Sequence, residues 1–342
     1  MRGRKNPPLP GEDDPKSLAS WRGRYLDWLG MRNFSPETVE SRGRDLYVFI
    51  VWCAMRGLSE PGEITRPILE RYQRHLYHWR KADGRPLSFR TQSGRLARVA
   101  GFFRWLAKEG HLLSNPASEL ELPRPEIRLP AATLTAEEAE TVLSGPDLTT
   151  PAGLRDRAML EVFYATAIRR TELTRLGLYD VDYARQVLLV RQGKGKKDRV
   201  VPLGERASAW LAAYRDQARP QLVAGVDPLV LFLSAAGTPI APKKLTDRIS
   251  GYVARSGVGK AGSCHLFRHT AATLMLEGGA DIRFIQAMLG HESLNTTQVY
   301  ARVAIGKLAE VHAATHPGAR LASAKAVHDA IVDAESAMGD DV

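Results

Sequence analysis

The chain has 342 residues, of which 44% are hydrophobic and 25% are charged. This composition is typical of globular proteins and excludes a largely disordered or fibrous chain, while the length favours two domains of about 150 residues each. Lys and Arg number 48 against 38 Asp and Glu, which gives a net charge of +10. An excess of this size indicates an anionic partner such as a nucleic acid.

The cysteine content and the lack of long apolar runs bear on location. Cys53 and Cys264 are too far apart in sequence to form a disulfide framework, which fits a reducing compartment. No apolar run approaches the roughly 20 residues that span a bilayer. Residues 1–14, which we expect to be disordered, lack the apolar stretch of a signal peptide. The sequence therefore predicts a soluble cytoplasmic protein with no membrane partner.

Residues 15–120 are predicted to form a helical domain. Ser35 is a typical helix N-cap. Behind it, apolar residues recur at three- and four-residue spacing, namely Leu46, Phe49, Ile50, Trp52 and Cys53. Thr65 and Ser88 open two more helices, and Gly110 is placed to end the last one. A bundle around one core is the simplest assembly of such helices.

Positive charge is concentrated in the first part of the chain. Residues 1–130 hold 23 basic and 15 acidic side chains, and the stretch from Arg71 to Gly110 alone holds ten against two. A basic stripe of this density is the electrostatic footprint of a phosphate backbone. The alternative interpretation is a solvated basic helix face, which the charge pattern alone leaves open.

A proline-rich segment precedes the second domain. Three prolines within residues 121–133 cannot continue a helix, so we expect a semi-rigid linker there. Residues 134–316 are predicted to form a mostly helical second domain. Strand-like runs at residues 187–190 and 199–203 flank a Gly-Lys-Gly turn, which indicates a β-hairpin. Residues 317–342 form a separate tail.

Four motifs of the second domain combine reactive side chains with turn or helix-start signals. They are YATAIRRTEL, containing Arg169 and Glu172; the Gly-Lys-Gly turn, containing Lys194; HLFRH, containing His265, Arg268 and His269; and LGH, containing His291, followed nine residues later by Tyr300. Taken singly, each has a structural explanation. Arg169 is then a surface cation, and Lys194 a charge that protects an edge strand.

Two kinds of bound group are disfavoured by the pattern. His265 and His269 have the four-residue spacing of two metal ligands, but Leu266 stands where the HExxH pattern needs Glu. Lys194 does not follow the GxxxxGK[ST] pattern of a nucleotide-binding loop. We therefore expect neither a metal nor another cofactor.

Together, the four motifs match a known family. The runs YATAIRRTEL, GKGKKDRVVPL, HLFRHTAATLML and MLGHESLNTTQVYARV resemble, in order and spacing, the tyrosine recombinase or phage integrase superfamily, especially its simple Xer-like members. The resemblance covers residues 15–316, although Ala167 stands where the family often has Gly. It implies a mainly α fold, with a helical, SAM-like core-binding domain followed by a mixed α+β catalytic domain that contains a small β-sheet or hairpin.

The resemblance implies an enzyme that exchanges DNA strands through a covalent 3′-phosphotyrosyl intermediate and a Holliday junction. In-line attack places extra negative charge on the phosphate oxygens, and Arg169 and Arg268 would be the bidentate donors that bind them. Tyr300 would be the nucleophile. With two arginines and a lysine stabilising the phosphate, the reaction implied needs no divalent metal ion. The phosphotyrosine bond stores the energy of the broken linkage, so rejoining needs no ATP.

The other reactive residues receive their roles from the same resemblance. His265 would assist proton transfer from the nucleophile, and His291 would donate a hydrogen bond to the phosphate. Lys194 would protonate the departing 5′ oxygen as a general acid. Glu172, one helical turn after Arg169, would orient the basic cluster; its other interpretation is an ordinary helix salt bridge.

The implied partners are double-stranded DNA recombination sites and other protomers. The resemblance implies that both domains close around the duplex in a tetrameric synapse, built from one protein or from two related recombinases, at the nucleoid of a prokaryotic cytoplasm. The tail at residues 317–342 is expected to dock as a helix on a neighbouring protomer, or else to be a frayed terminus. Two other functions stay open at this point: a type IB topoisomerase-like enzyme, and a DNA-binding regulator without catalysis.

Overall fold

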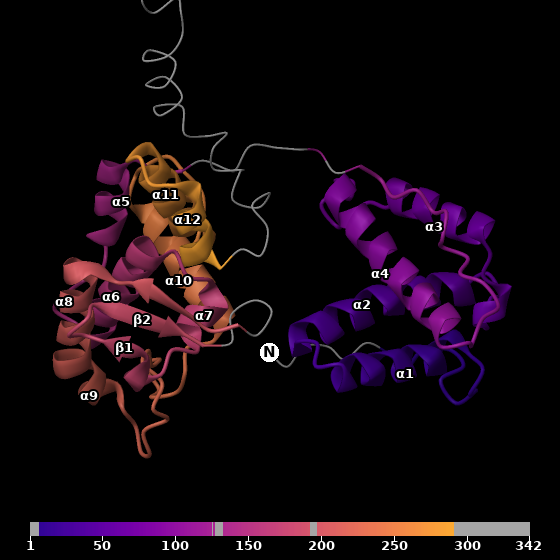
Figure 1. Ribbon diagram of the computed structural model, residues 1–342, viewed down its shortest axis with the longest axis horizontal. Helices are drawn as coiled ribbons and strands as arrows, with labels where there is room; N and C mark the ends of the chain where they lie inside the picture. Colours follow the sequence, from indigo (N-terminus) through magenta and orange to yellow (C-terminus); the bar gives the residue numbers. More distant parts are fainter. Residues whose placement is uncertain (1–6, 125, 127–132, 192–196, 291–342) are drawn as a thin grey trace, which may run out of the picture. The chain divides into compact units, whose positions relative to one another are not determined.

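The computed structural model describes residues 7–124, 126, 133–191 and 197–290. In this part of the chain the protein is mostly helical, with one small antiparallel sheet (Figure 1). The chain divides into two compact units, residues 1–128 and 129–342. The expected fold class is confirmed: a helical unit precedes a mixed α+β unit.

The described residues of the first unit form four α-helices and one short 3₁₀-helix. They are α1 (Leu18–Met31), α2 (Pro36–Ala54), η1 (Pro61–Glu63), α3 (Arg66–His78) and α4 (Phe89–Lys108). Ser35 and Ser88 cap α2 and α4, because each side chain accepts a hydrogen bond from a backbone N–H of the first turn. After α4, Gly110 adopts a φ of +78°, which favours glycine. These three predicted boundary residues are confirmed.

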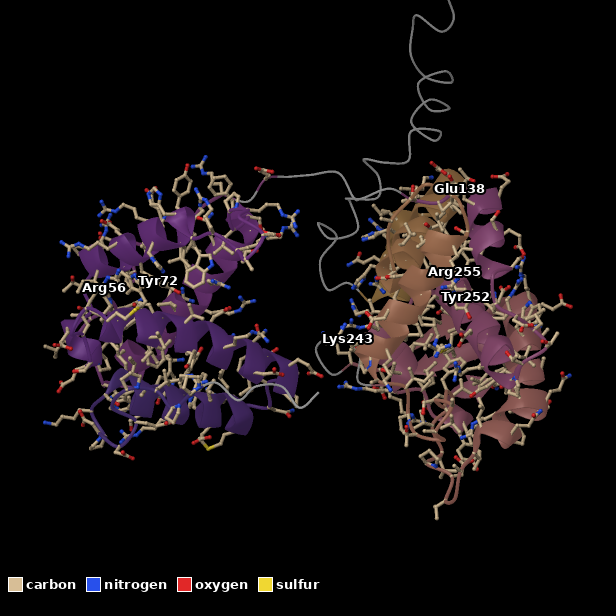
Figure 2. The ribbon with its side chains drawn as sticks, turned by 180° about the vertical axis from the view of Figure 1, so that it is seen from behind. Arg56, Tyr72, Glu138, Lys243, Tyr252 and Arg255 are labelled. Carbon is tan, nitrogen blue, oxygen red and sulfur yellow. The ribbon has the colours of Figure 1, made fainter. Side chains whose placement is uncertain are left out.

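The core of the first unit is rich in aromatic side chains. Phe49, Tyr72, Phe102 and Phe103 are completely buried between α2, α3 and α4. Burial of one such side chain contributes about 1.5–3 kcal/mol relative to exposure. All five apolar residues predicted to line α2 are buried. At the rim of this core (Figure 2), the guanidinium carbon of Arg56 lies 4.1 Å from the centroid of the Trp52 ring.

The second unit is built from helices around one small sheet. Its helices are α5 (Ala136–Leu143), α6 (Pro151–Thr166), α7 (Arg170–Thr174), η2 (Leu178–Asp180), α8 (Gly204–Ala213), the π-helix η3 (Tyr214–Ala218), α9 (Arg219–Leu222), α10 (Pro242–Arg255), α11 (Cys264–Glu277) and α12 (Ile282–Leu289). Its strands are β1 (Val181–Asp182), β2 (Val187–Val190) and β3 (Arg199–Pro202). No helix of the described residues is long and apolar enough to cross a membrane.

Helix α6 is the central element of this unit. Residues 155–163 are buried on every side of the helix, and α6 packs against α8, α9, α11 and η3. A helix buried all round must pair its charged residues internally. Arg155 and Asp156 do so: the Arg155 Nη2 atom lies 2.8 Å from Oδ1 of Asp156, and the Tyr252 hydroxyl donates to Oδ2 of Asp156 at 2.7 Å.

The sheet has the order β1-β2-β3, with antiparallel neighbours. Val190 of β2 pairs with Arg199 of β3, so the predicted hairpin is confirmed. Strand β3 ends at Pro202, one residue before the predicted end at residue 203. Strand β1 was not expected, since its two residues are too few to produce an alternating pattern.

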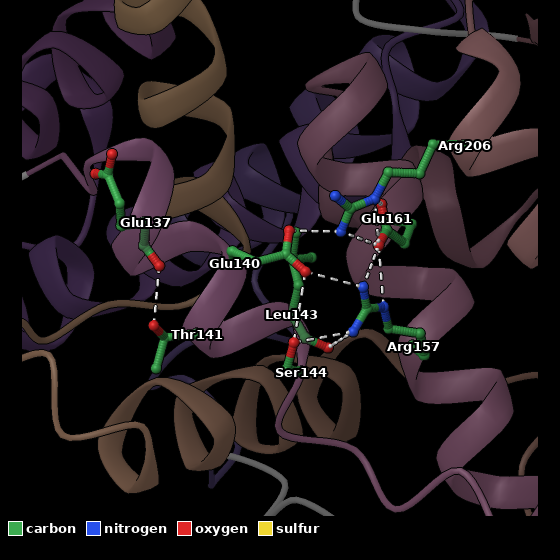
Figure 3. A network of polar contacts seen from close by, with 8 residues as sticks. All are labelled: Glu137, Glu140, Thr141, Leu143, Ser144, Arg157, Glu161 and Arg206. Atoms are coloured by element: carbon green, nitrogen blue, oxygen red, sulfur yellow. Dashed lines mark hydrogen bonds and ion pairs between the residues drawn. The ribbon is translucent and has the colours of Figure 1, made fainter.

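A second charged network joins α5, α6 and α8 (Figure 3). This Glu161 cluster consists of Glu140, Arg157, Glu161 and Arg206. Arg157 donates from Nε to Glu161 at 2.9 Å and from Nη1 to the carbonyl of Leu143, the last residue of α5, at 2.8 Å. Arg206 donates from Nη2 to both glutamates. Two arginines and two glutamates thus balance each other in charge.

Candidate active site

The candidate site begins where the central helix ends. At the end of α6, the N–H of Ala167 donates to the carbonyl of Phe163 at 3.0 Å, and Ala167 has a φ of +50°. This left-handed conformation costs a residue with a side chain about 1–2 kcal/mol, and the alanine is completely buried. The turn ends α6 and leads directly to Arg169.

Arg169 and Glu172 form a local pair at the start of α7. Arg169 is the N-cap of α7 and not part of the helix, which corrects the expectation that both residues lie on one helix. The N–H of Arg169 donates to Oε2 of Glu172 at 2.8 Å, and its Nη1 donates to Oε1 at 2.8 Å. Glu172 therefore fixes both the backbone and the guanidinium of Arg169.

Arg268 approaches the same place from α11. Its guanidinium is buried, donates from Nη1 to the carbonyl of Ala167 at 2.5 Å, and donates from Nη2 to the carbonyl of Leu289 at 2.8 Å. The first and third sequence motifs, separated by about 100 residues, thus meet at the end of α6. Figure 1 shows α7, α11 and α12 in the same unit.

Sequence reasoning missed a third arginine of the site, Arg199 on β3. It donates from Nη1 and Nη2 to the two carboxylate oxygens of Glu172, at 3.0 and 2.8 Å, and from Nε to the carbonyl of Met288 at 3.0 Å. The alternation of β3 carries a signal that could have revealed it. Val201 is buried and Val200 is 60% exposed, so Arg199 occupies an inward position of the strand.

Three arginines therefore bind three consecutive carbonyls at the end of α12. Arg199, Arg268 and Arg169 donate to Met288, Leu289 and Gly290 respectively. Helix carbonyls in the last turn lack partners within the helix and carry partial negative charge, so guanidiniums are suitable partners. We call Arg169, Glu172, Arg199 and Arg268 the Glu172 cluster.

The charge of Glu172 is strongly stabilised. Its burial by itself raises the pKa of the carboxyl, but the hydrogen bonds from Arg199 and from the N–H of Arg169, together with both guanidinium charges, lower the pKa to about 2. Glu172 is thus ionised at neutral pH. The cluster then holds three positive charges against one negative charge, and this positive excess can bind an anion with the geometry of a phosphate.

His265 lies in the first turn of α11, one turn before Arg268. Partial burial, reinforced by the charges of Arg268 and Arg170, lowers the pKa of His265 below its ordinary value. The imidazole is therefore neutral at pH 7 and retains a lone pair that can accept a proton. Among the described residues, no group of three His, Cys, Asp or Glu side chains could hold a metal ion.

Three predicted site residues lie outside the described residues: Lys194, His291 and Tyr300. Two of them are next to described elements in the chain. Lys194 falls between the end of β2 and the start of β3, and His291 follows Gly290, whose carbonyl accepts from Arg169. The structure thus brings Arg169, Glu172, Arg199 and Arg268 together, with His265 beside them on α11.

A comparison with known protein families matches residues 132–306 to the phage integrase family. The chain belongs to this family. It is 48% identical over 300 residues to tyrosine recombinase XerC 2 of Ralstonia nicotianae, covering 88% of this chain and 86% of that relative. The resemblance seen in the four motifs is confirmed, and the chain is a Xer-like tyrosine recombinase, an enzyme of site-specific DNA recombination.

Solved structures of the family have the same fold. A crystal structure of the XerH site-specific recombinase bound to palindromic difH substrate has a TM-score of 0.67, at 18% identity, and the match covers 90% of this chain and 98% of that one. A lambda integrase tetramer bound to a Holliday junction has a TM-score of 0.60, at 19% identity, over 83% of this chain and 77% of that one. Neither a topoisomerase nor a non-catalytic regulator is favoured by these comparisons.

Proposed function

We propose that this recombinase cuts DNA by attack of Tyr300 on a backbone phosphate held by Arg169 and Arg268. The phenolic oxygen forms a bond to phosphorus, and the bond from phosphorus to the 5′ oxygen breaks. His265 takes the phenolic proton, and Lys194 gives a proton to the 5′ oxygen. His291 donates a hydrogen bond to the phosphate. Attack of a 5′ hydroxyl from another strand reverses these steps and rejoins the DNA.

The observation that carries this proposal is the unbalanced charge of the Glu172 cluster. The two guanidiniums that bind the phosphate in this proposal, those of Arg169 and Arg268, are fixed by Glu172 and by the α12 carbonyls before any DNA binds. Donors that are fixed in advance need no reorganisation when charge develops on the phosphate, and this is the largest usual contribution to such catalysis. The neutral state of His265 at pH 7 suits a proton acceptor.

Residues of both units are available to contact the DNA backbone. In the first unit, α2 and α4 form a groove in which three arginines outnumber one glutamate. It is lined by Glu37, Thr38, Ser41, Arg42, Gly94, Ala97, Arg98, Gly101 and Arg104. In the second unit, Lys243 at the start of α10 extends into solvent with 87% of its side chain exposed (Figure 2). Cations on such surfaces release counterions when they bind phosphates. The first unit thus acts as a DNA clamp, and residues 121–133 as the linker between domains.

The assembly is proposed to be a tetramer on two recombination sites. Strand exchange joins two duplexes, each cut on both strands, so it requires four nucleophiles. Lambda integrase forms such a tetramer on a Holliday junction, and the partner protomers of this chain are copies of itself or of a related recombinase. The tail at residues 317–342, outside the described residues, docks on a neighbouring protomer. We place the protein in the cytoplasm, at the nucleoid.

A covalent trapping assay tests the nucleophile. Tyr300→Phe removes the attacking oxygen, so the variant should bind a nicked DNA substrate but form no covalent adduct on a denaturing gel. The matched control is Tyr179→Phe, because Tyr179 is an exposed tyrosine of the same unit, and this variant should form the adduct at the wild-type rate. An adduct from Tyr300→Phe would rule out the assignment.

A further inference from the structure

Arg199 is the arginine of the cluster that the proposed reaction does not use. Its side chain is only 13% exposed, although it belongs to a short strand at the surface of the unit. Burial of a guanidinium is costly unless its donors are satisfied and its charge is paired. Arg199 meets both conditions through Glu172 and the carbonyl of Met288.

Through Glu172, Arg199 acts on Arg169. The two guanidiniums share one carboxylate: Arg169 Nη1 and Arg199 Nη1 both donate to Oε1, while the N–H of Arg169 and Arg199 Nη2 both donate to Oε2. Without Arg199, a carboxylate with 5% exposure would keep a single cation, and its position would no longer be fixed from both sides. The guanidinium of Arg169, which this carboxylate orients, would then also lose its fixed orientation.

Arg199 also acts on the end of α12. Its donation to Met288 adds to those of Arg268 and Arg169 to the next two carbonyls. Gly290 has a φ of +63°, and a Cβ added there would lie 3.2 Å from three atoms of the Arg199 side chain. Glycine is thus favoured at this position both by its backbone conformation and by the close approach of Arg199.

We propose that Arg199 is a positioning residue of the recombinase, which orients Arg169 through Glu172 and fixes the end of α12 beside Arg169 and Arg268. This inference rests on the proposed function, because it assumes that Arg169 binds the reacting phosphate. Arg199 itself does not touch the phosphate. Its removal lowers the rate of cleavage at saturating DNA and leaves the affinity for DNA nearly unchanged.

Arg157 of the Glu161 cluster provides a matched control. Its side chain is 8% exposed, against 13% for Arg199, and like Arg199 it pairs with a buried glutamate and donates to the carbonyl at the end of a helix. The two arginines belong to the same unit and differ in what their glutamate orients. A loss of stability that both variants share is therefore a structural effect. A loss of cleavage that only the Arg199 variant shows is instead an effect on the orientation of Arg169.

The experiment measures the rate of covalent adduct formation at saturating nicked DNA, the affinity by mobility shift and the melting temperature. Arg199→Gln should cleave on the order of 10-fold or more slowly, since misplacing a reacting group by about 1 Å costs up to about 10²-fold. Both variants should lower the melting temperature, and by similar amounts. Arg157→Gln, however, should cleave within about twofold of wild type. Equal cleavage by the two variants, at a temperature where both are folded, would overturn the proposal.

A double-mutant cycle separates positioning from simple destabilisation. If Arg199 acts through Glu172, the variant that combines Arg199→Gln with Glu172→Gln should cleave no more slowly than the slower single variant. Multiplied losses would show that the two residues act independently and would contradict the proposal. If Arg199→Gln does not fold, Arg199→Lys decides, because it keeps the charge but not the planar fork that binds both carboxylate oxygens of Glu172. Wild-type cleavage by Arg199→Lys would also contradict the proposal. Absence of adduct from the wild-type protein would instead refute the proposed function.

Discussion

The Glu161 and Glu172 clusters use the same chemistry with different results. Each surrounds a glutamate that is 2–5% exposed with two arginines, and each includes a hydrogen bond from an arginine to a carbonyl at a helix end. The Glu161 cluster adds a second glutamate, so its charges cancel. The Glu172 cluster adds a third arginine, Arg268, through the end of α12.

The difference supports our proposal that the Glu172 cluster binds a phosphate whereas the Glu161 cluster is structural. A balanced network such as the Glu161 cluster has no net charge with which to bind an ion. Its role is to hold three helices of the unit together. An unbalanced one keeps a surplus of positive charge at a fixed position, which folding alone does not neutralise. This surplus costs stability in the free protein, and a bound phosphate removes the cost. Perturbed groups of this kind concentrate at functional sites.

The largest expected effect follows from removing a surplus charge. Arg169→Ala and Arg268→Ala should each lower cleavage by about 10²-fold or more, which is the usual loss for one fixed donor. The affinity for DNA should change far less, because many other cations contact the backbone. Single-turnover cleavage and mobility shifts, at a temperature where each variant is folded, measure the two quantities. Arg206→Ala, taken from the balanced cluster, should cleave normally, and a comparable loss in that variant would abolish the distinction between the clusters.

An intermediate effect is expected for the pH dependence of cleavage. Since burial and nearby arginines lower the pKa of His265, the neutral form persists below pH 6.5, and cleavage should fall only at more acidic pH. Arg170→Gln removes one of these charges, so the acid limb of the rate profile should move to higher pH. Arg215→Gln, an arginine that pairs with Asp216, serves as the control. An acid limb that stays in place in Arg170→Gln would show that another group controls it.

The sequence predicted most of the fold, because its signals are local. Caps such as Ser35 and Ser88, the apolar face of α2 and the strands around the Gly-Lys-Gly turn each lie within a few residues. Arg169, Glu172, His265 and Arg268 were named as reactive residues from their motifs, but their roles came only through the resemblance. Their contacts join residues about 100 positions apart, which no periodicity encodes.

Arg199 could not be recognised as a site residue from the sequence motifs alone. It stands within the run that carries the resemblance, but in sequence it looks like any basic residue beside a basic turn. Only the pairing of β3 with β2 gives it an inward position, and only the folded unit brings Glu172 and Met288 to it. The N-cap position of Arg169 was missed for a similar reason, since helix ends are the least certain part of any pattern.

The smallest expected effect concerns Ala167, whose carbonyl accepts from Arg268. Ala167→Gly relieves the left-handed strain, which costs about 1–2 kcal/mol, but it also increases the freedom of the unfolded chain by about 0.4–1 kcal/mol. The free energy of unfolding should therefore rise by no more than about 1.6 kcal/mol, measured by urea denaturation, with cleavage within twofold of wild type. A tenfold loss of cleavage would show that the methyl group of Ala167 helps to hold Arg268.

The attachment of three arginines to the end of α12 has a mechanical consequence. Met288, Leu289 and Gly290 are held in parallel by side chains from β3, α11 and the start of α7. Because three side chains hold these carbonyls, a displacement of the end of α12 would also displace the guanidiniums. Hydrogen bonds tolerate displacements of only a few tenths of an ångström near their usual length of about 2.9 Å. A shift of Gly290 would therefore change the geometry of the two arginines that we propose bind the phosphate.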